Sequence, residues 1–487
     1  MSWLCQTCAV CDDAAVRIGK IRERSPASSY ADDAVRATLV AALGAEHVHS
    51  SPIDTALYAR DASVIDEGFT TVVCFPATTS EVQACVRAAR SHGRPFVARG
   101  SGTGLAGGAV PCGGAVVITT TRMDTIHEVD LASGVAWVGP GVLNLDVTRH
   151  LAPYGVHFAP DPSSQQSCSI GGNVANNSGG PHCLAYGVTS AHVVALEVVL
   201  PDGEIAVLGG LDPEPTGLDL RGAFVGSEGT MGIATKIAVR LTPNPPTIRT
   251  MLIDFESVAE AGATVSGIIA AGVVPAAILL VEVDGLPGGV DTDTDTVAAI
   301  ARANRARTIR IAADETERAA LWKGRKSAFG AIARIKPNYY LHDTVIPRTR
   351  LVEVLERVYA IAQKYDLLVM NVFHAGDGNL HPLLVYDARE PGTTERVYAA
   401  GKEIVEASLA VGGVLSGEHG IGLEKRAFMH LQFSEDDLEH QAKLRRAFDP
   451  FGLANPGKVL PSGASCGDVF ALSPEQQRAM RDGGAWL

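Results

Sequence analysis

Two histidines flank a predicted hairpin turn in the segment Val369-MNVFHAGDGNLHPLL-Val385. The dipeptide Asp377-Gly378 within it favours a two-residue turn between antiparallel strands. In that register, residues whose numbers sum to 755 face each other, and 374 + 381 = 755. His374 and His381 are therefore predicted to form a cross-strand pair with Cβ atoms about 4.5–5.5 Å apart. Such a pair can bind one metal ion, and the alternative is two histidines stacked in a core.

The segment Ser416-GEHGI-Gly422 can supply a carboxylate and a further imidazole. We expect Glu418 to complete a metal site with His374 and His381, which leaves coordination positions open for a substrate. A divalent ion is expected, with zinc as the first candidate. His419 follows Glu418 directly, so the loop can direct Glu418 to the metal and His419 to a substrate hydroxyl. His419 is thus the candidate general base, and the alternative is a histidine of a surface loop.

Three glycine-rich loops can present backbone N–H groups to a phosphate-bearing ligand. The first, Arg99-GSGTGLAGG-Ala109, has a formal G-x-G-x-x-G pattern, but Pro111 prevents the helix that the dinucleotide fingerprint requires. The loops 169–183 and 226–232 follow, together with the turn 160–164. Glycine lacks the Cβ that would block the approach of a pyrophosphate. Several such loops favour a large phosphate-bearing cofactor over flexible structural loops.

The composition is that of a globular protein with several domains. The chain has 487 residues, and 41 Lys+Arg against 54 Asp+Glu give a formal net charge of −13. At about 100–200 residues per domain, this length predicts two to four domains. The acidic balance, without basic clusters, argues against nucleic acid as a partner. The longest apolar stretch, 267–281, is interrupted by Gly272 and Pro275, so no transmembrane segment is predicted.

The nine cysteines are too sparse for a disulfide framework and favour a reducing cytoplasm. Cys5, Cys8 and Cys11 are spaced like iron–sulfur ligands, but the fourth cysteine and the proline of such runs are missing. We therefore expect an unstructured tail rather than a cluster. The first 30 residues lack the apolar core of a leader peptide, so a cytoplasmic protein is expected.

Helices and strands that position these motifs are predicted on both sides of a proline-rich break. Helical periodicity covers 32–47 and 80–91, and the second of these helices lies between two short strands in a βαβ unit. Further strands are expected at 115–120, 134–141, 192–200 and 237–241. The break at 242–246 marks a domain boundary. Beyond it, helices and strands alternate again, with helices around 314–334 and 438–448.

The motifs RGSGTGLAGG, APDPSSQQSCSIGGNVANNSGG, CLAYG and GSEGTMGI occur in this order. They resemble the FAD-binding domain of the vanillyl-alcohol-oxidase/PCMH flavoprotein superfamily. The later motifs are similar to those of the FAD-binding subunit of glycolate oxidase and the related D-lactate and D-2-hydroxyacid dehydrogenases. The resemblance covers about 54–461. It implies an α+β fold, with a PCMH-type FAD-binding domain of two α/β subdomains and a C-terminal FAD-linked-oxidase cap domain containing an antiparallel sheet and helices.

This resemblance also implies a domain organisation and a set of FAD-binding residues. The expected segments are a disordered tail 1–31, the FAD-binding domain 32–245, the cap domain 246–448, a returning segment 449–462 and a C-terminal tail 463–487. The predicted FAD-binding residues are Arg99, Gly100, Ser101, Gly102, Thr103, Gly104, Asp161, Pro162, Ser163, Ser164, Gly171, Gly172, Asn173, Glu228, Gly229, Ile233 and Asn455. Relatives that bind FAD covalently use His or Cys, often a His in the first loop. That loop has Ser101 and Thr103 instead, so non-covalent FAD is expected.

The same resemblance agrees with the metal site, because His374, His381 and Glu418 match metal-ligand positions in the 2-hydroxyacid dehydrogenases. It implies that His419 removes the hydroxyl proton of the substrate while a hydride passes to the flavin. It also matches Arg325, in Leu321-WKGRKSA-Phe329, to the arginine that binds the substrate carboxylate. The alternative for Arg325 is a solvated helix arginine.

The segment NYYLHDTVIP offers further pocket residues, namely Tyr339, Tyr340 and His342. The 2-hydroxyglutarate enzymes that the chain resembles carry a lysine where this sequence has Leu341. A small monocarboxylate such as glycolate or D-lactate is therefore expected as substrate rather than a diacid. Against the family pattern, the passage from Pro275 to Ile278 also omits a stretch long enough for one strand and one helix.

Electron transfer away from the flavin is expected to need partner subunits, because the chain has no haem motif or complete iron–sulfur motif of its own. By resemblance, these are a second flavoprotein-like subunit and an iron–sulfur subunit that delivers electrons to membrane quinone. The expected location is thus cytoplasmic, with a peripheral position at the inner face of the membrane through those partners. Two alternatives are a metal-dependent hydrolase and a non-catalytic flavoprotein scaffold.

Overall fold

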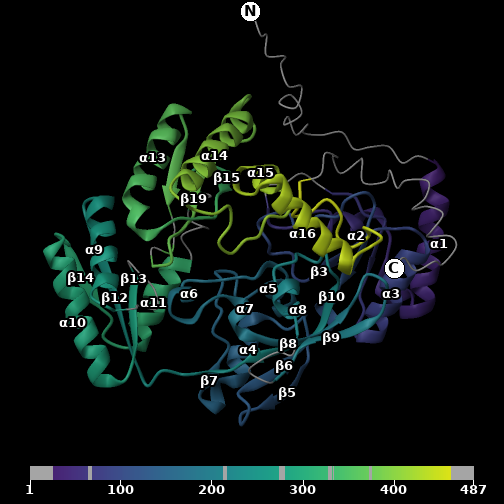
Figure 1. Ribbon diagram of the computed structural model, residues 1–487, viewed down its shortest axis with the longest axis horizontal. Coiled ribbons are helices and arrows are strands. Elements are labelled where there is room, and N and C mark those ends of the chain that lie inside the picture. The colour runs from purple at the N-terminus through teal and green to yellow at the C-terminus, as the bar shows by residue number, and fades with distance from the viewer. Residues whose placement is uncertain are drawn as a thin grey trace, which may run out of the picture.

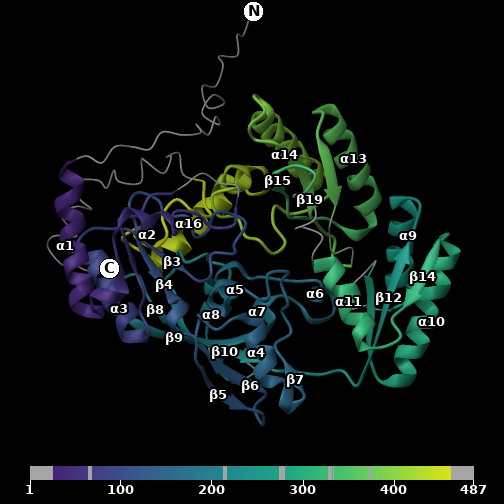
Figure 2. The same cartoon turned by 180° about the vertical axis from the view of Figure 1, so that it is seen from behind.

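The computed structural model describes residues 26–63, 68–211, 217–273, 280–326, 332, 334–371, 374 and 376–461. The cysteine run at 5–11 and the passage from Pro275 to Ile278 lie outside these residues. Figures 1 and 2 show two bodies that lie side by side and meet near the centre of the molecule. We call residues 26–246 with 449–461 the first domain, and residues 247–448 the cap domain.

The first domain begins with a four-stranded sheet in the order β1-β2-β4-β3. Its strands are β1 (Val48–His49), β2 (Val72–Cys74), β4 (Val116–Thr119) and β3 (Phe96–Arg99). The predicted βαβ unit is present, because β2 and β3 both run parallel to β4, which lies between them. The helices α1 (Pro26–Leu43) and α3 (Thr79–Ser91) contribute apolar side chains to the same core as this sheet.

The two predicted helices of this region differ from the structure mainly at their ends. Helix α3 begins after Thr78, whose side-chain oxygen accepts a hydrogen bond from the Glu81 backbone N–H at 3.2 Å. Helix α1 begins at Pro26 rather than at residue 32 and ends at Leu43 rather than at residue 47. The reason for the early end is Gly44, whose φ of 91° leaves the helical region before a short 3-10 turn.

A five-stranded antiparallel sheet, in the order β5-β6-β10-β8-β9, forms the other half of the first domain. Its strands are β5 (Ile126–Asp130), β6 (Val135–Val138), β10 (Ile233–Arg240), β8 (Val193–Val199) and β9 (Ile205–Gly209). Apolar side chains from three helices share its core. These helices are α4 (Asn144–Leu151), α5 (Ile170–Asn176) and α8 (Leu220–Phe224). Smaller elements are α2 (Pro52–Ala56), α6 (Cys183–Tyr186), α7 (Thr189–His192), β7 (Val156–His157) and β11 (Thr242–Pro243).

The cap domain contains two three-stranded antiparallel sheets, ordered β13-β12-β14 and β15-β19-β17. The strands of the first are β12 (Thr247–Asp254), β13 (Leu280–Gly285) and β14 (Thr308–Ile311), and those of the second are β15 (Asn338–Leu341), β17 (Leu368–Asn371) and β19 (Pro382–Tyr386). A two-stranded ribbon pairs β16 (Thr344–Val345) with β18 (Asn379–Leu380). These antiparallel sheets, together with the mixed sheet of the first domain, confirm the predicted α+β fold.

Helices pack against both cap sheets in Figure 1. Helices α9 (Val258–Ala270) and α10 (Pro287–Ala303) share the core of the first sheet, and α13 (Leu351–Lys364) and α14 (Thr393–Ala410) share that of the second. The remaining helices are α11 (Glu315–Lys326), α15 (Met429–Gln432) and α16 (Glu435–Phe448). After α16 the chain returns to the first domain, where Ala454 forms a parallel bridge with Phe96. Across the described ranges, no helix combines the length and apolarity that a membrane crossing requires.

Candidate functional site

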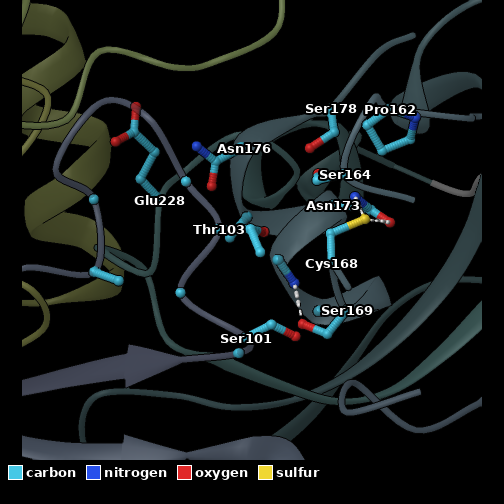
Figure 3. A pocket seen from close by; sticks show the side chains of 18 of the residues that line it. Ser101, Thr103, Pro162, Ser164, Cys168, Ser169, Asn173, Asn176, Ser178 and Glu228 are labelled. Atoms are coloured by element: carbon cyan, nitrogen blue, oxygen red, sulfur yellow. Dashed lines mark hydrogen bonds between the residues drawn. The ribbon is translucent and has the colours of Figure 1, made fainter. Parts of the chain in front are cut away.

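A cavity lies where the three glycine-rich loops of the first domain meet the cap domain. Figure 3 shows the first-domain side of this cavity, with Ser101 and Thr103 of the first loop opposite Asn173 and Ser178 of the second. Most of the predicted FAD-binding residues line it, namely Arg99 to Gly104, Pro162 to Ser164, Gly171 to Asn173, Glu228, Gly229 and Ile233. From the cap domain, the lining includes Tyr339, Leu341, His381, Glu418 and His419. The structure therefore places the predicted cofactor loops and most of the predicted catalytic cluster on one cavity.

Close packing between the loops explains two of the glycines. Ser169 caps helix α5, and its side-chain oxygen accepts a hydrogen bond from the Gly172 N–H at 3.3 Å. A Cβ on Gly100 would lie 2.2 Å from that same oxygen, and a Cβ on Gly171 would lie 2.7 Å from Cβ of Pro140. Any larger residue at these two positions would push the loops apart and change the shape of the cavity.

Two predicted FAD-binding residues, Asp161 and Asn455, do not appear among the residues that line the cavity. The Asp161 carboxylate lies 2.8 Å from Nδ1 of His182. The Asn455 side-chain amide donates to the carbonyl oxygens of Gly108 and Glu228 at 2.8 and 2.7 Å. In the described part of the chain, these side chains hold the loops together, and a direct contact with the cofactor stays a prediction.

The predicted metal ligands form a buried group. Oε1 of Glu418 lies 3.6 Å from Nε2 of His374 and 3.3 Å from Nε2 of His381, and the two imidazole rings are 5.2 Å apart. One ligand atom from each residue lies within 4.8 Å of the others. Burial disfavours the charged form of Glu418, but the neighbouring histidines lower its pKa to about 2. The carboxylate is therefore ionised at neutral pH, as a metal ligand must be.

The predicted register of this hairpin is wrong by two residues. His374 is bridged to Asn379 rather than to His381, and β17 pairs with β19 so that Asn371 faces Pro382. The turn is longer than predicted, because the bridge between His374 and Asn379 leaves four positions between the strands instead of two. A shift of two preserves the face on which a side chain points. His381 is therefore a diagonal neighbour of His374, and both still reach Glu418.

The loop 416–422 is held from the cap side by Asp343, a residue that sequence reasoning missed. This fully buried carboxylate accepts hydrogen bonds from the Ser416 hydroxyl at 2.6 Å and from the His419 N–H at 2.9 Å. Nζ of Lys425 lies 3.0 Å away. Burial acts to raise the pKa of Asp343, but the charge of Lys425 holds it well below its usual range. The available signal was an acidic residue inside the segment NYYLHDTVIP, next to His342.

The first domain holds the same loop from the opposite side. The carboxylate of Glu228 accepts from the N–H groups of Ile421 and Gly422 at 2.7 and 2.8 Å. The Asn176 amide donates to the His419 carbonyl at 2.7 Å. A Cβ on Gly420, where φ is 84°, would lie 2.7 Å from Oε1 of Glu228. The predicted cofactor residue Glu228 thus also fixes the loop that carries Glu418 and His419.

The candidate base His419 stacks on His381, with ring centroids 5.0 Å apart and an interplanar angle of 8°. Its Nδ1 is 3.9 Å from Asp343, and its Nε2 is 3.6 Å from Glu418. Burial lowers the pKa of His419 to about 4, although both carboxylates oppose this. His419 is therefore neutral at pH 7 and can accept a proton.

The substrate residues predicted on β15 divide between the two faces of the strand. Tyr339 and Leu341 line the cavity. Tyr340 and His342 point the other way, because side chains alternate along a strand. The His342 ring instead packs against α14, where a Cβ on Gly401 would lie 2.5 Å from Nε2. The expectation that Tyr340 and His342 complete the pocket is therefore wrong.

Arg325 lies on α11 and is close enough to the metal-ligand group to interact with it electrostatically. Burial lowers the pKa of its guanidinium, and the charge of Glu418 opposes this. Arg325 in turn acts to lower the pKa of His374. A substrate carboxylate near the ligand group would therefore lie within the field of this arginine.

Comparison with known proteins identifies the family. Residues 70–209 match the family described as "FAD binding domain", and 276–459 match "FAD linked oxidases, C-terminal domain". The chain is 42% identical to the glycolate oxidase subunit GlcD of Escherichia coli K12, in an alignment that covers 82% of this chain and 86% of that protein. This chain belongs to the FAD-linked oxidase family. The predicted resemblance is thereby confirmed.

Two further similarities place this FAD-linked oxidase among its relatives. The D-lactate dehydrogenase of Archaeoglobus fulgidus is 31% identical, over 80% of this chain and 91% of that protein. The solved structure of 4-ethylphenol oxidase from Gulosibacter chungangensis, in its isoeugenol complex, is 19% identical. It covers 89% of this chain and 98% of its own, with a TM-score of 0.73. At that identity the likeness shows a shared fold, which spans both domains.

Unsatisfied polar atoms at the cavity fit the groups expected in an FAD-linked oxidase. Nη1 of Arg99 is buried without a hydrogen-bond partner among the described residues, which suits a donor to a pyrophosphate oxygen. Within the same described set, Nε2 of His381 is also buried and makes no hydrogen bond, although the carboxylate of Glu418 lies 3.3 Å away, as suits a pair of metal ligands around one ion. The residues present therefore fit both FAD and a divalent metal.

Proposed function

We propose that this FAD-linked oxidase converts a small D-2-hydroxy acid, glycolate or D-lactate, to the 2-oxo acid. The observation that carries the proposal is a single cavity with glycine loops on one side and His381, Glu418 and His419 on the other. The names of the relatives, a glycolate oxidase subunit and a D-lactate dehydrogenase, support this substrate class. When bound, FAD supplies the hydride acceptor, and a divalent metal, zinc first, lowers the pKa of a coordinated hydroxyl.

In this mechanism, His374, His381 and Glu418 would hold the metal. His419 takes the proton of the substrate hydroxyl, because it is neutral at pH 7 and lies beside Glu418. Its main chain is fixed on both sides by Asp343 and Asn176, so little reorientation is needed when the proton moves. FAD would be held without a covalent bond by the predicted residues of the glycine loops.

Substrate size follows from the wall of the cavity on the cap side. Tyr339 and Leu341 line this wall, and Leu105 of the first glycine loop lines the cavity beside them and belongs to the same apolar cluster. Arg325 binds the substrate carboxylate through its planar guanidinium. A second, distal carboxylate would meet this apolar wall and lose its hydration without a partner. The arrangement thus favours glycolate and D-lactate over 2-hydroxyglutarate.

We also propose that electrons leave through a second flavoprotein-like subunit and an iron–sulfur subunit. The support is that the similar protein of Escherichia coli is named as a subunit of glycolate oxidase. In that arrangement, the chain would lie at the inner face of a membrane through its partners. Full-rate turnover of the isolated chain with molecular oxygen would argue against this proposal.

Anaerobic titration of the purified yellow protein tests the reaction. We expect glycolate or D-lactate to bleach the flavin absorbance, with little effect from L-lactate or D-2-hydroxyglutarate. A protein that holds FAD but stays oxidised with all four acids would be a non-catalytic scaffold. A colourless protein that cannot be reconstituted with FAD would favour a metal-dependent hydrolase.

A further inference from the structure

A buried ionic network joins the two domains at one end of the cap sheet β13-β12-β14. Its centre is Glu282 on β13, which is 2% exposed. Its carboxylate accepts two hydrogen bonds from Arg318, with Nε and Nη2 at 3.0 and 2.8 Å. Nε1 of Trp322 donates to it at 2.8 Å, and the Thr250 hydroxyl donates from β12. Two elements of the cap domain, α11 and β12, therefore converge on one carboxylate of β13.

His182 of the first domain enters this network from the opposite side. Its Nε2 lies 3.3 Å from Oε1 of Glu282, and its Nδ1 lies 2.8 Å from Oδ2 of Asp161. Its ring packs on the indole of Trp322, with centroids 5.0 Å apart. Although burial opposes protonation, the two carboxylates raise the pKa of His182 to about 10. His182 is thus an imidazolium between a carboxylate of each domain.

The network connects two parts of the catalytic machinery that are far apart in the sequence. Asp161 belongs to the 160–164 turn of the cofactor side, whose neighbours Pro162 and Ser163 line the cavity. On the cap side, Arg318, Trp322 and Arg325 are spaced i, i+4 and i+7 on α11, so they share one face of the helix. The first two bind Glu282, and the third lies close enough to Glu418 to interact with its charge.

We propose that His182 is a positioning residue that ties the cofactor-side turn to α11 and so holds Arg325 where it binds the substrate carboxylate. This inference rests on the proposed function for the role of Arg325. Removing one partner of a buried ion pair leaves an uncompensated charge, and the surrounding structure moves to relieve it. A displacement of α11 by about 1 Å would weaken the hold of Arg325 on the substrate, since misplacement on this scale costs roughly 10²-fold.

The test variant is His182→Gln, which can no longer bridge two carboxylates as a cation. The chain supplies a matched control in Tyr186→Phe. Tyr186 also links the first domain to β13, through a hydrogen bond to Asp284, but that contact does not involve α11. Both variants remove one interdomain contact, and only the first disturbs the network of Arg318 and Trp322. The full chain loaded with FAD and metal is used throughout.

The first readout is binding of oxalate, a carboxylate probe that cannot be oxidised to a 2-oxo acid. We expect His182→Gln to raise the oxalate Kd and the substrate KM roughly 10- to 100-fold, with a smaller change in kcat. Tyr186→Phe should stay within about twofold of the wild type. The second readout is amide hydrogen exchange over 315–326, which should accelerate in His182→Gln and not in Tyr186→Phe.

A double-mutant cycle separates positioning from a general loss of structure. If His182 acts through Arg325, the double variant with His182→Gln and Arg325→Ala should bind oxalate with a Kd within about twofold of that of Arg325→Ala alone. Full additivity, or unchanged exchange and unchanged oxalate binding in His182→Gln, would overturn the inference. If His182→Gln does not fold, Trp322→Phe removes one donor to Glu282 and should show the same pattern in weaker form.

Failure of the proposed function would look different. A wild-type protein that neither binds oxalate nor is reduced by any 2-hydroxy acid would refute that function. In this case the exchange experiment still decides the structural part, since faster exchange of 315–326 in His182→Gln alone supports the coupling. Equal exchange in both variants refutes it.

Discussion

Two largely covered histidines at the domain interface, His419 and His182, each with a side chain 16% exposed, have opposite electrostatic surroundings. Each has two carboxylates nearby, yet the pKa of His419 is lowered to about 4 and that of His182 is raised to about 10. The difference lies in the distance of the carboxylates and in the other charges nearby. Carboxylate oxygens lie 2.8 and 3.3 Å from the ring nitrogens of His182, but 3.9 and 3.6 Å from those of His419. His381 and Lys425 also oppose protonation of His419.

This comparison teaches that a nearby carboxylate does not by itself make a histidine a cation. The contact distance, the burial of the ring and the positive charges nearby decide together whether the imidazole holds a proton. One histidine therefore stays neutral and suits proton transfer. The other stays charged and suits a structural link. The predictions below test each side of this contrast.

The largest effect is expected from His374→Ala, which removes one of three proposed metal ligands. Metal content should fall from about one ion per chain to nearly none, and flavin reduction by substrate should be lost with it. FAD content should not change. Metal analysis on the same sample as the reduction assay provides the measurement. Retention of stoichiometric metal would remove His374 from the ligand set.

His419→Asn should slow flavin reduction by roughly 10²–10⁴-fold, the usual cost of a lost general base. Asparagine is of similar size but cannot accept the proton at neutral pH, so FAD and metal content should be preserved. Single-turnover reduction measures the effect. His342→Asn is the matched control, because His342 lies on the opposite face of β15. A His419→Asn rate within a few-fold of wild type would show that another group is the base.

Glu228→Ala should slow reduction by roughly 10–10²-fold, because Ile421 and Gly422 lose their acceptor and the loop of Glu418 and His419 shifts. Metal affinity should fall as well. Glu228→Gln retains one acceptor oxygen and should have a smaller effect. Stopped-flow reduction and metal titration of both variants provide the measurement. A change in FAD affinity alone would mean that Glu228 acts on the cofactor and not on the loop.

The smallest effect concerns stability at alkaline pH. The pKa of His182 is about 10 in the folded protein and about 6.5 in the unfolded chain. Between these two pKa values the folded protein holds a proton on His182 that the unfolded chain has lost. The stabilisation of the folded state by this charge is therefore complete below about pH 6.5 and is lost as the pH rises through 10. The charged and titratable groups around His182 are Asp161, Glu282, Arg318 and His157. The positive charge of His182 acts to lower the pKa of His157.

Thermal unfolding from pH 6 to 10 measures this effect. The Tm of the wild type should fall with rising pH by several degrees more than that of His182→Gln, at roughly 2–4 °C per kcal/mol for domains of this size. Tyr186→Phe should follow the wild type. Parallel curves for the wild type and His182→Gln would mean that His182 is not the charged link described above.

Much of this protein could be predicted from local sequence patterns. The βαβ unit followed from local periodicity, whereas the α+β fold and the FAD-linked oxidase family followed from the resemblance of several ordered motifs to a known family. Helix ends were less accurate, as at α1, where Gly44 stops the helix before residue 47. His374, His381 and Glu418 were grouped correctly in space, although the register between the two histidines was wrong.

Only the tertiary structure decided the remaining features, because each depends on contacts between segments far apart in the chain. A four-position turn set the hairpin register, and strand alternation turned His342 away from the cavity. Asp343 and Glu228 clamp one loop from two domains, and His182 meets Glu282 across the same interface. No sequence pattern records the distances between these imidazoles and the charges around them, and those distances determine which histidine is neutral and which is charged.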